Sequence, residues 1–373
     1  MLSTTDPMTC LAPAGNAPRY DSGRATKFSA LLTKNMTDGT TIRGTLNVIW
    51  WNANNFLHFL AGKAKSPRSR WPKSQEQYAE KCARVDTALN ELFSVTGKPH
   101  VLILAEVTQQ AANELQARIL PGYRVSSLDV KKDSPTPQIA MFYAPDTKDF
   151  RFREQVPIVV PRMPDETRPM GVLDVEFDGH TVRIISCHWQ SRIGGEVAKK
   201  ARGKMADHLA VENYQFVDNN RQKHHLMIVG DFNDDPFDNS LEDLHTHRHR
   251  ERSKSKPHRF DKQVNRLHLY NTSWRLLGEN FAHPITPPAN PLLKECAGTF
   301  YWRDYKTWHH FDQIIVSGGL VGNTFPHIDE SKIGIGSTAA FLDSDGLPLS
   351  FIYENGKVAG LSDHLPIFAS IRI

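Results

Sequence analysis

Acidic, amide and imidazole side chains recur in this chain beside short apolar runs. In the stretch 225–236, four apolar residues lead to Gly230, which is followed by Asp231 and Asn233. A run of four apolar residues, two of them β-branched, predicts a buried strand, and the glycine lets the backbone turn at its end. A carboxylate and an amide at that point could bind a metal ion or move a proton. Alone, the pattern is also typical of an ordinary strand-to-turn junction.

The same arrangement occurs at five further places, which argues against a simple turn. A polar residue follows each of the apolar runs 46–51, 101–105 and 182–187, and polar residues precede the runs 313–317 and 365–373. These polar residues are Asn52, Glu106, His188, Asp312 and the triplet Ser362, Asp363 and His364. Because the motifs run from near residue 50 to residue 364 and would converge on one site, we predict one catalytic domain over residues 45–373. Residues 1–44 are predicted to be an N-terminal extension.

In their order along the chain, these motifs resemble those of the endonuclease/exonuclease/phosphatase superfamily. That group contains DNase I-like nucleases, abasic-site endonucleases, deadenylases, sphingomyelinases and inositol polyphosphate 5-phosphatases. The matching residues are Asn52, Ala-Glu at 105–106, Gly-Asp-Phe-Asn at 230–233, Phe-Asp-Gln-Ile-Ile-Val-Ser at 311–317 and Ser-Asp-His at 362–364. The resemblance implies an α/β four-layer sandwich, in which two mixed β-sheets pack face to face and helices flank them, as in DNase I.

The resemblance also implies how metal and phosphate are bound. Glu106 is expected to be the principal metal ligand, with help from Asp363 and Asn52. Mg²⁺ suits these oxygen ligands, and Mn²⁺ is a possible substitute. Asn52 is also expected to bind phosphate, and Arg192 would add a guanidinium fork for phosphate oxygens.

The remaining motif residues are expected to move protons and to hold the phosphate. Asp312 would orient the imidazole of His364, as a buried acid does in many histidine-dependent sites. The attacking water would be activated either by Asp231 or by the pair of His364 and Asp312. His188 and Asn233 would hold the phosphate and the leaving oxygen, although a buried histidine such as His188 can also be a hydrogen-bonded core residue.

Two segments carry most of the positive charge. The stretch 63–73 holds five Lys and Arg residues and Trp71, and the stretch 245–266 has eight Lys and Arg residues against two acids, a net charge of +6. The whole chain has a net charge of +4, so the chain without the stretch 245–266 has a net charge of −2. The basic character is therefore local. Such segments are often solvated surface, but beside a phosphodiester site they could bind nucleic acid, with Trp71 stacking on a base. We predict a basic insertion at about 245–266 and a nucleic acid partner, foremost DNA.

Composition excludes several other classes of protein. The chain of 373 residues is 39% hydrophobic and 23% charged, and it contains no apolar run near the ~20 residues that a membrane helix requires. The first twenty residues lack the pattern of a secretion signal, and the four cysteines lack the spacing of a metal site or a disulfide framework. We therefore expect a cytoplasmic enzyme that does not associate with membranes.

Taken together, these observations predict a metal-dependent phosphodiesterase, foremost a nuclease that hydrolyses DNA. An RNase or deadenylase would use the same core residues, as would a phosphatase acting on inositol phosphates or lipids. A lipid phosphatase should show an apolar lipid-facing loop or a secretion signal, and neither is evident in the sequence.

Overall fold

The computed structural model describes most of the chain from Gly44 onward. The described residues are 44–59, 72–128, 138–161, 167–218, 224–244, 246, 260–261, 266–277, 290–322, 324–354 and 357–373. Gly44–Ile373 forms one compact unit. Within the described ranges, no helix is both long and apolar enough to span a membrane.

The first sheet is built around a parallel pair of strands, β1 (Thr45–Phe56) and β2 (Val101–Val107). Its strand order is β15, β19, β1, β2, β4 and β3, with β16 also paired to β19, and all of these other pairings are antiparallel. The remaining strands are β3 (Arg124–Ser127), β4 (Gln138–Tyr143), β15 (His327–Ile328), β16 (Gly334–Ile335) and β19 (Ile367–Arg372).

The second sheet has a similar design around the parallel pair β7 (His180–His188) and β8 (His224–Asp231). Its strand order is β11, β14, β8, β7, β6 and β5, and the other pairings are antiparallel. The remaining strands are β5 (Arg151–Glu154), β6 (Gly171–Phe177), β11 (Leu269–Asn271) and β14 (Asp312–Ser317). Three two-stranded pairs complete the β-structure: β9 (Phe260–Asp261) with β10 (Arg266–Leu267), β12 (Phe300–Trp302) with β13 (Thr307–His309), and β17 (Ile352–Glu354) with β18 (Lys357–Ala359).

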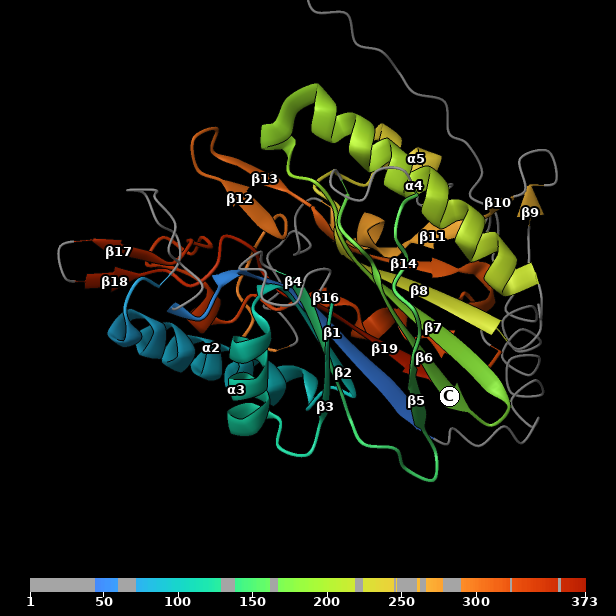
Figure 1. The fold of residues 1–373 in the computed structure, drawn as a ribbon, viewed down its shortest axis with the longest axis horizontal. Coiled ribbons are helices and arrows are strands. Elements are labelled where there is room, and N and C mark those ends of the chain that lie inside the picture. Colours follow the sequence, from blue (N-terminus) through green and yellow to red (C-terminus); the bar gives the residue numbers. More distant parts are fainter. Residues whose placement is uncertain are drawn as a thin grey trace, which may run out of the picture. The chain divides into compact units, whose positions relative to one another are not determined.

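Helices cover the outer face of each sheet (Figure 1). The helices α2 (Gln75–Thr96) and α3 (Gln109–Ile119) lie on the side of the first sheet, and α4 (Gly195–Asp218) and α5 (Asn239–Asp243) lie on the side of the second. The order of layers is therefore helix, sheet, sheet, helix. This arrangement confirms the predicted four-layer sandwich with two mixed sheets.

The continuous apolar run of β8 is explained by burial on both faces. Met227 and Val229 belong to the core that includes the first sheet, whereas Leu226 and Ile228 pack in the second core with residues of α4. Side chains alternate along a strand, so Asp231 extends from the same face as Val229, toward the space between the sheets. The same alternation in β7 directs His188 to that side.

Local hydrogen bonds fix the starts of α2 and α3. The hydroxyl of Ser74 accepts a hydrogen bond from the backbone N–H of Gln77, and the side chain of Gln77 accepts one from the N–H of Lys73. Thr108 caps α3 by accepting from the N–H of Ala111. These caps satisfy N–H groups that have no partner within their helices.

The sheet topology gathers the predicted polar residues at one end of the sandwich. The strands β1, β2, β7 and β8 end there, while β14 and β19 begin there. In the second sheet, Asp231 pairs with His188 on one side and with Asp312 on the other. The strand ends thus supply a common site without requiring long loops.

Gly230 allows β7 and β8 to approach closely just before Asp231. A Cβ atom at this position would lie 2.1 Å from the carbonyl oxygen of Cys187, a contact that requires the backbone to move. We therefore expect Gly230→Ala to lower the free energy of unfolding by about 2 kcal/mol or more, as overpacking does. Urea denaturation followed by circular dichroism measures this change.

Gly203→Ala is the matched control. Gly203 lies within α4, and its nearest neighbour would be 3.6 Å from the new Cβ, so we expect this variant to be more stable by about 0.5–1 kcal/mol. If both variants were as stable as the natural protein, β7 and β8 would not approach each other at Gly230 as closely as the structure shows.

Candidate active site

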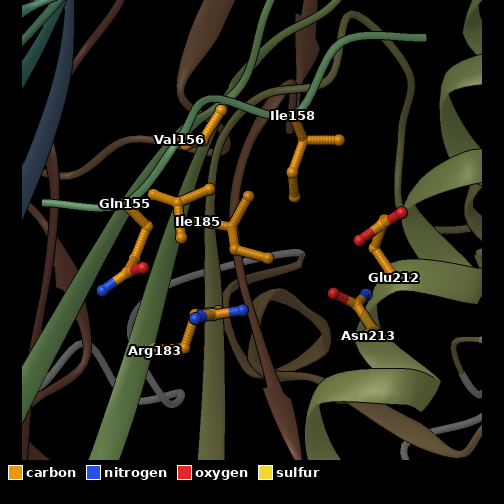
Figure 2. A pocket seen from close by; sticks show the side chains of 8 residues that line it. Gln155, Val156, Ile158, Arg183, Ile185, Glu212 and Asn213 are labelled. Carbon is orange, nitrogen blue, oxygen red and sulfur yellow. The ribbon is translucent and has the colours of Figure 1, made fainter. Parts of the chain in front are cut away.

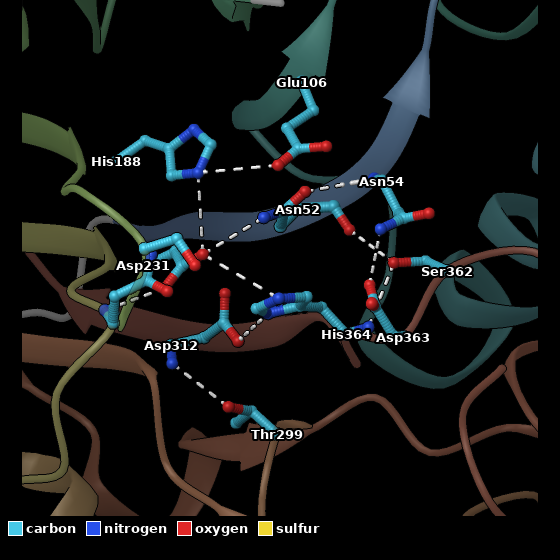
Figure 3. Close-up of polar contacts among 12 residues, drawn as sticks. Asn52, Asn54, Glu106, His188, Asp231, Thr299, Asp312, Ser362, Asp363 and His364 are labelled. Carbon is cyan, nitrogen blue, oxygen red and sulfur yellow. Dashed lines mark hydrogen bonds and ion pairs between the residues drawn. The ribbon is translucent and has the colours of Figure 1, made fainter. Parts of the chain in front are cut away.

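The predicted site residues converge on the carboxylate of Asp231 (Figure 3). Its Oδ2 accepts a hydrogen bond from Asn52 Nδ2 at 3.1 Å, and it lies 3.7 Å from His188 Nε2 and 3.8 Å from His364 Nε2. Its Oδ1 accepts from the backbone N–H of Asn233 at 2.9 Å. Both sheets therefore contribute to the surroundings of this one carboxylate.

Asp312 and His364 form a buried pair next to Asp231. The Oδ2 of Asp312 lies 2.8 Å from His364 Nδ1, and its Oδ1 accepts a hydrogen bond from Trp50 Nε1, also at 2.8 Å. The backbone N–H of Asp312 donates to Thr299 Oγ1, and that of His364 donates to Ser362 Oγ. These contacts hold the imidazole in one orientation, with Nε2 turned toward Asp231.

Burial and charge set the protonation of this cluster. Burial raises the pKa of Asp231 to about 6, although the charge of His364 opposes the rise. Burial alone would lower the pKa of His364, but the carboxylates of Asp312 and Asp231 outweigh burial and raise that pKa to about 10. Burial lowers the pKa of His188 well below its usual value. At neutral pH, His364 is therefore a cation between two carboxylates, while His188 is neutral.

Glu106 and Asp363 lie on opposite sides of Asn52 and Asn54 in Figure 3. The Oε2 of Glu106 accepts from the backbone N–H of Asn55 at 2.8 Å, and its Oε1 is 3.6 Å from the Nε2 of His188. Asp363 accepts through Oδ1 from Asn54 Nδ2 at 2.6 Å. The structure therefore brings each predicted metal ligand to the end of β1, next to a different part of the 52–55 segment.

Asn54 is a site residue that the sequence analysis missed. Asn54 and Asn55 both have left-handed backbone conformations, with φ values of 45° and 55°, and asparagine tolerates this region better than most residues. The resulting bend directs the Asn54 amide toward Asp363. Its Oδ1 is buried and has no hydrogen-bond partner among the described residues. Three asparagines in four residues were the available sequence signal.

Lys81 of α2 was also missed. It is fully buried, its Nζ donates to the backbone oxygen of Asn54, and it lies 5.0 Å from the ring centroid of Phe351. Burial lowers its pKa to about 7, and the carboxylates of Glu106 and Asp363 limit the decrease. Lys81 thus holds the 52–55 segment through the backbone oxygen of Asn54 and places an amino group close to Glu106 and Asp363.

Two sets of residues could hold a divalent metal ion. Ligand atoms of Asp231, Asp312 and His364 all lie within 4.8 Å of one another. However, Asp312 Oδ2 is already hydrogen-bonded to His364 Nδ1, and Asp312 Oδ1 already accepts a hydrogen bond from Trp50 Nε1. The carboxylates of Glu106 and Asp363, together with the unpartnered Oδ1 of Asn54, are oxygen ligands of the kind that Mg²⁺ prefers. Asp363 also has partners in this structure, because its Oδ1 accepts from Asn54 Nδ2 and its Oδ2 accepts from Ser350 Oγ.

Arg192 and Asn233 make contacts that differ from the expected binding of phosphate. The guanidinium of Arg192 donates to the backbone oxygen of Asn233 at 2.9 Å and to the carboxylates of Asp235 and Asp238. The amide nitrogen of Asn233 donates to the backbone oxygen of Trp189 at 3.0 Å. In this structure both side chains brace the loop after β8, and their predicted roles toward phosphate remain predictions.

Several predicted features lie outside the described residues. These are Trp71, most of the basic stretch 63–73, and most of the basic insertion 245–266. Their proposed contacts with nucleic acid remain predictions from the sequence.

The chain belongs to the Endonuclease/Exonuclease/phosphatase family, whose sequence profile matches residues 61–280. It is accordingly a hydrolase of phosphoester bonds with the DNase I-like fold, and enzymes of this family generally depend on a divalent metal ion. The resemblance inferred from the motifs is confirmed. No curated protein matches the chain in sequence.

Solved structures show the same fold at low sequence identity. A D. rerio TDP2 humanized by 14 mutations is 13% identical to this chain and has a TM-score of 0.51. The match covers 88% of this chain and 99% of that one. A mannosyl-6-phosphatase from Bacteroides thetaiotaomicron is 16% identical, with a TM-score of 0.51, covering 88% of this chain and 100% of that one. TDP2 and a mannosyl-6-phosphatase therefore share this fold.

We expect Asp312→Asn to lower the pKa of His364 from about 10 toward the ordinary value near 6.5. The substitution keeps the shape of the side chain but removes the carboxylate that is hydrogen-bonded to the imidazole. Titration of the His364 ring resonances by NMR, in the metal-free protein, measures the shift.

Asp329→Asn serves as the control for this titration. Asp329 pairs with Arg372 at the other end of β19, so its loss should leave the pKa of His364 unchanged. An unchanged pKa in Asp312→Asn would show that the pair does not control the charge of His364.

Proposed function

We propose that this protein is a divalent-metal-dependent phosphodiesterase that cleaves nucleic acid, with DNA as its principal substrate. The observation that carries the proposal is the aromatic hairpin formed by β12 and β13, which lies against the catalytic pair. Phe300 forms a backbone bridge with His364, and the two ring centroids are 4.8 Å apart.

The hairpin presents several aromatic rings in succession. On one face, Phe300 packs edge to face on Trp302 at 6.4 Å between ring centroids, and Trp302 packs edge to face on Tyr305 at 5.0 Å. Tyr301 and Trp308 pack together at 5.2 Å on the opposite face of the hairpin. Tyr305 is 72% exposed. Stacking on such rings is a common way to bind the bases of single-stranded nucleic acid, whereas a small phosphate ester has no base to stack. The contacting series of Phe300, Trp302 and Tyr305, which begins at His364, therefore favours a polymeric substrate with bases.

The charge pattern of the sequence supports the same substrate. The stretch 245–266 carries a net charge of +6, and the stretch 63–73 carries five basic residues. Lysine and arginine attract nucleic acid by releasing counterions from the phosphate backbone. In the sequence, both stretches lie between segments that carry site residues, and we propose that they contact a substrate that extends beyond the scissile phosphate.

The site residues suggest a division of chemical roles. Asp231 is the proposed general base for the attacking water, because Asn52, His188 and His364 all direct polar atoms toward its Oδ2. The cationic His364, oriented by Asp312, would stabilise negative charge on the phosphate. This assignment favours Asp231 over the pair of His364 and Asp312, because that pair already holds its proton.

Glu106, Asp363 and Asn54 are the proposed metal ligands. A bound Mg²⁺ would polarise the phosphate and neutralise the charge that develops during hydrolysis. Asn52 lies between these residues and Asp231 in Figure 3, so it is placed to link the metal site to the proposed base. Its Oδ1 accepts from the N–H of Asn54, so we propose that Asn52 also positions Asn54 for the metal.

We expect Asp231→Asn to reduce cleavage of DNA by a factor on the order of 10³, as the loss of a general base does. The assay compares labelled single-stranded DNA, duplex DNA and RNA with inositol phosphates and mannose 6-phosphate, all with Mg²⁺ and with EDTA. Asp329→Asn, which makes the same chemical change away from the site, should keep full activity.

The substrate panel also separates the proposal from its alternatives. Release of inorganic phosphate from the small phosphate esters, without cleavage of any nucleic acid, would contradict it and indicate a phosphatase. Cleavage of RNA alone would instead indicate an RNase or a deadenylase.

We expect Glu106→Gln to weaken the binding of Mn²⁺, a spectroscopic substitute for Mg²⁺, by at least about tenfold, since one charged ligand is lost. Electron paramagnetic resonance of free Mn²⁺ measures the affinity without reference to activity. Asp312→Asn should bind Mn²⁺ nearly as well as the natural protein does. The opposite ranking would place the metal at Asp231, Asp312 and His364 instead.

A further inference from the structure

The cavity beneath α4 does not extend the active site. It has a volume of about 170 Å³ and lies between α4 and the outer face of the second sheet (Figure 2), whereas the active-site side chains project from the inner face. Its lining residues Val172, Ile185 and Asn213 are at most 2% exposed, so these three offer a ligand almost no accessible surface. Groups that recognise substrate are better sought at the end of the sandwich, around the catalytic pair.

His309 of β13 lies in register with the catalytic histidine. Phe300 pairs with His309 across the hairpin of β12 and β13, and it also forms an antiparallel bridge with His364. Residues paired directly across neighbouring strands have their side chains on the same face. The ring centroid of Phe300 accordingly lies 6.5 Å from that of His309 and 4.8 Å from that of His364. Two strand spacings separate the two histidines by roughly 10 Å.

A buried acid on the loop after β8 holds the imidazole of His309. Its Nδ1 lies 2.8 Å from Asp235 Oδ2, and because a carboxylate only accepts hydrogen bonds, Nδ1 is the donor. Asp235 Oδ1 accepts from the backbone N–H of His310 at 2.9 Å. Burial would raise the pKa of Asp235, but these two hydrogen bonds outweigh burial and lower that pKa. The arrangement repeats that of His364 with Asp312, in which Nδ1 also lies 2.8 Å from a carboxylate oxygen.

The other ring nitrogen of His309, Nε2, is available to a substrate. It makes no hydrogen bond within the described part of the chain, and it reaches solvent. The side chain is 17% exposed, compared with 8% for His364. Phe311 stacks on the ring at 4.7 Å between centroids, which fixes the ring plane. An imidazole that is held on one edge and open on the other can bind a ligand without first being ordered.

The charges around His309 allow an anion to approach Nε2. In the imidazolium form Nε2 donates a hydrogen bond, and a phosphate oxygen close by favours that form. The acids of the adjoining loop are Asp234, Asp235 and Asp238, and the guanidinium of Arg192 contacts all three. The carboxylate behind the imidazole is therefore shared with a second cation. A phosphate at Nε2 would lie on the opposite edge of the ring from that carboxylate.

We propose that His309 binds, through Nε2, a phosphate that flanks the scissile phosphate on the same nucleic acid strand. This inference rests on the proposed function, because a nucleic acid strand carries a further phosphate at each nucleotide. The scissile phosphate lies at His364, and Phe300 lies between the two imidazoles, where its ring meets the intervening nucleotide. His309 therefore favours a strand over a phosphate monoester, and it acts in substrate binding rather than in hydrolysis.

The test compares His309→Ala with the natural protein on a short single-stranded DNA in the presence of Mg²⁺. We expect KM to rise about tenfold, as the loss of a charge-assisted hydrogen bond does, while kcat changes by less than about twofold. The slope of log KM against log salt concentration should become shallower by about 0.7, because one phosphate contact is lost. His309→Lys, which keeps a cation at this position, should recover most of the lost affinity.

His208→Ala is the matched control. It removes a partly exposed histidine that pairs with Glu212 on α4, so its KM and salt dependence should equal those of the natural protein. A second set of substrates carries one neutral methylphosphonate, placed at each flanking position in turn. At the position that His309 contacts, this change should raise KM for the natural protein but leave KM for His309→Ala unchanged.

The outcomes separate binding from a structural role. If His309→Ala lowered kcat equally on all these strands, His309 would only support the loop after β8, and the proposal would be wrong. Normal cleavage of DNA by the natural protein, with the same KM in His309→Ala, would overturn this inference alone. Absence of cleavage of any nucleic acid by the natural protein would overturn it together with the proposed function.

Discussion

The ion pair of His364 with two buried carboxylates is the constraint on which the rest of the site depends. Asp231 and Asp312 are almost completely buried, and a buried carboxylate is costly unless a cation and hydrogen bonds compensate for it. His364 supplies that cation from the segment before β19, while Asn52 and Trp50 supply hydrogen bonds from β1. Because the carboxylates lie on the second sheet and their partners on the first, the catalytic groups also tie the two sheets together.

The topology of the sheets explains how residues so far apart in sequence meet. Each sheet contains one parallel pair, and parallel neighbours end at the same edge, so Asn52 lies near Glu106 and His188 lies beside Asp231. The antiparallel strand β14 begins at that edge, which places Asp312 opposite Asp231. The site is therefore built from rigid strand ends, which hold side chains more accurately than mobile loops do.

The sequence was sufficient to predict the two sheets and the polar residues of the central cluster, because apolar runs and polar strand ends are local patterns. The sequence was insufficient to predict contacts between residues that are far apart along the chain. Lys81 falls on the apolar stripe of α2, yet a lysine on a helix is ordinarily taken as exposed. The contacts of the Arg192 guanidinium with Asp235 and Asp238 could not be predicted from the sequence, and its predicted role toward phosphate stays a prediction. The role of Asn54 depends on a left-handed backbone conformation that composition alone does not specify.

Substrate choice has a different physical origin from the chemistry of hydrolysis. TDP2 and a mannosyl-6-phosphatase have the same fold as this chain, so the layers of strands and helices do not define what is cleaved. Segments that extend beyond those layers can define which substrate is cleaved. The hairpin of β12 and β13 emerges just before Asp312 and places its first aromatic ring against His364. Since its remaining rings continue away from the catalytic pair, a substrate that uses them must itself extend past the scissile phosphate, as a nucleic acid strand does.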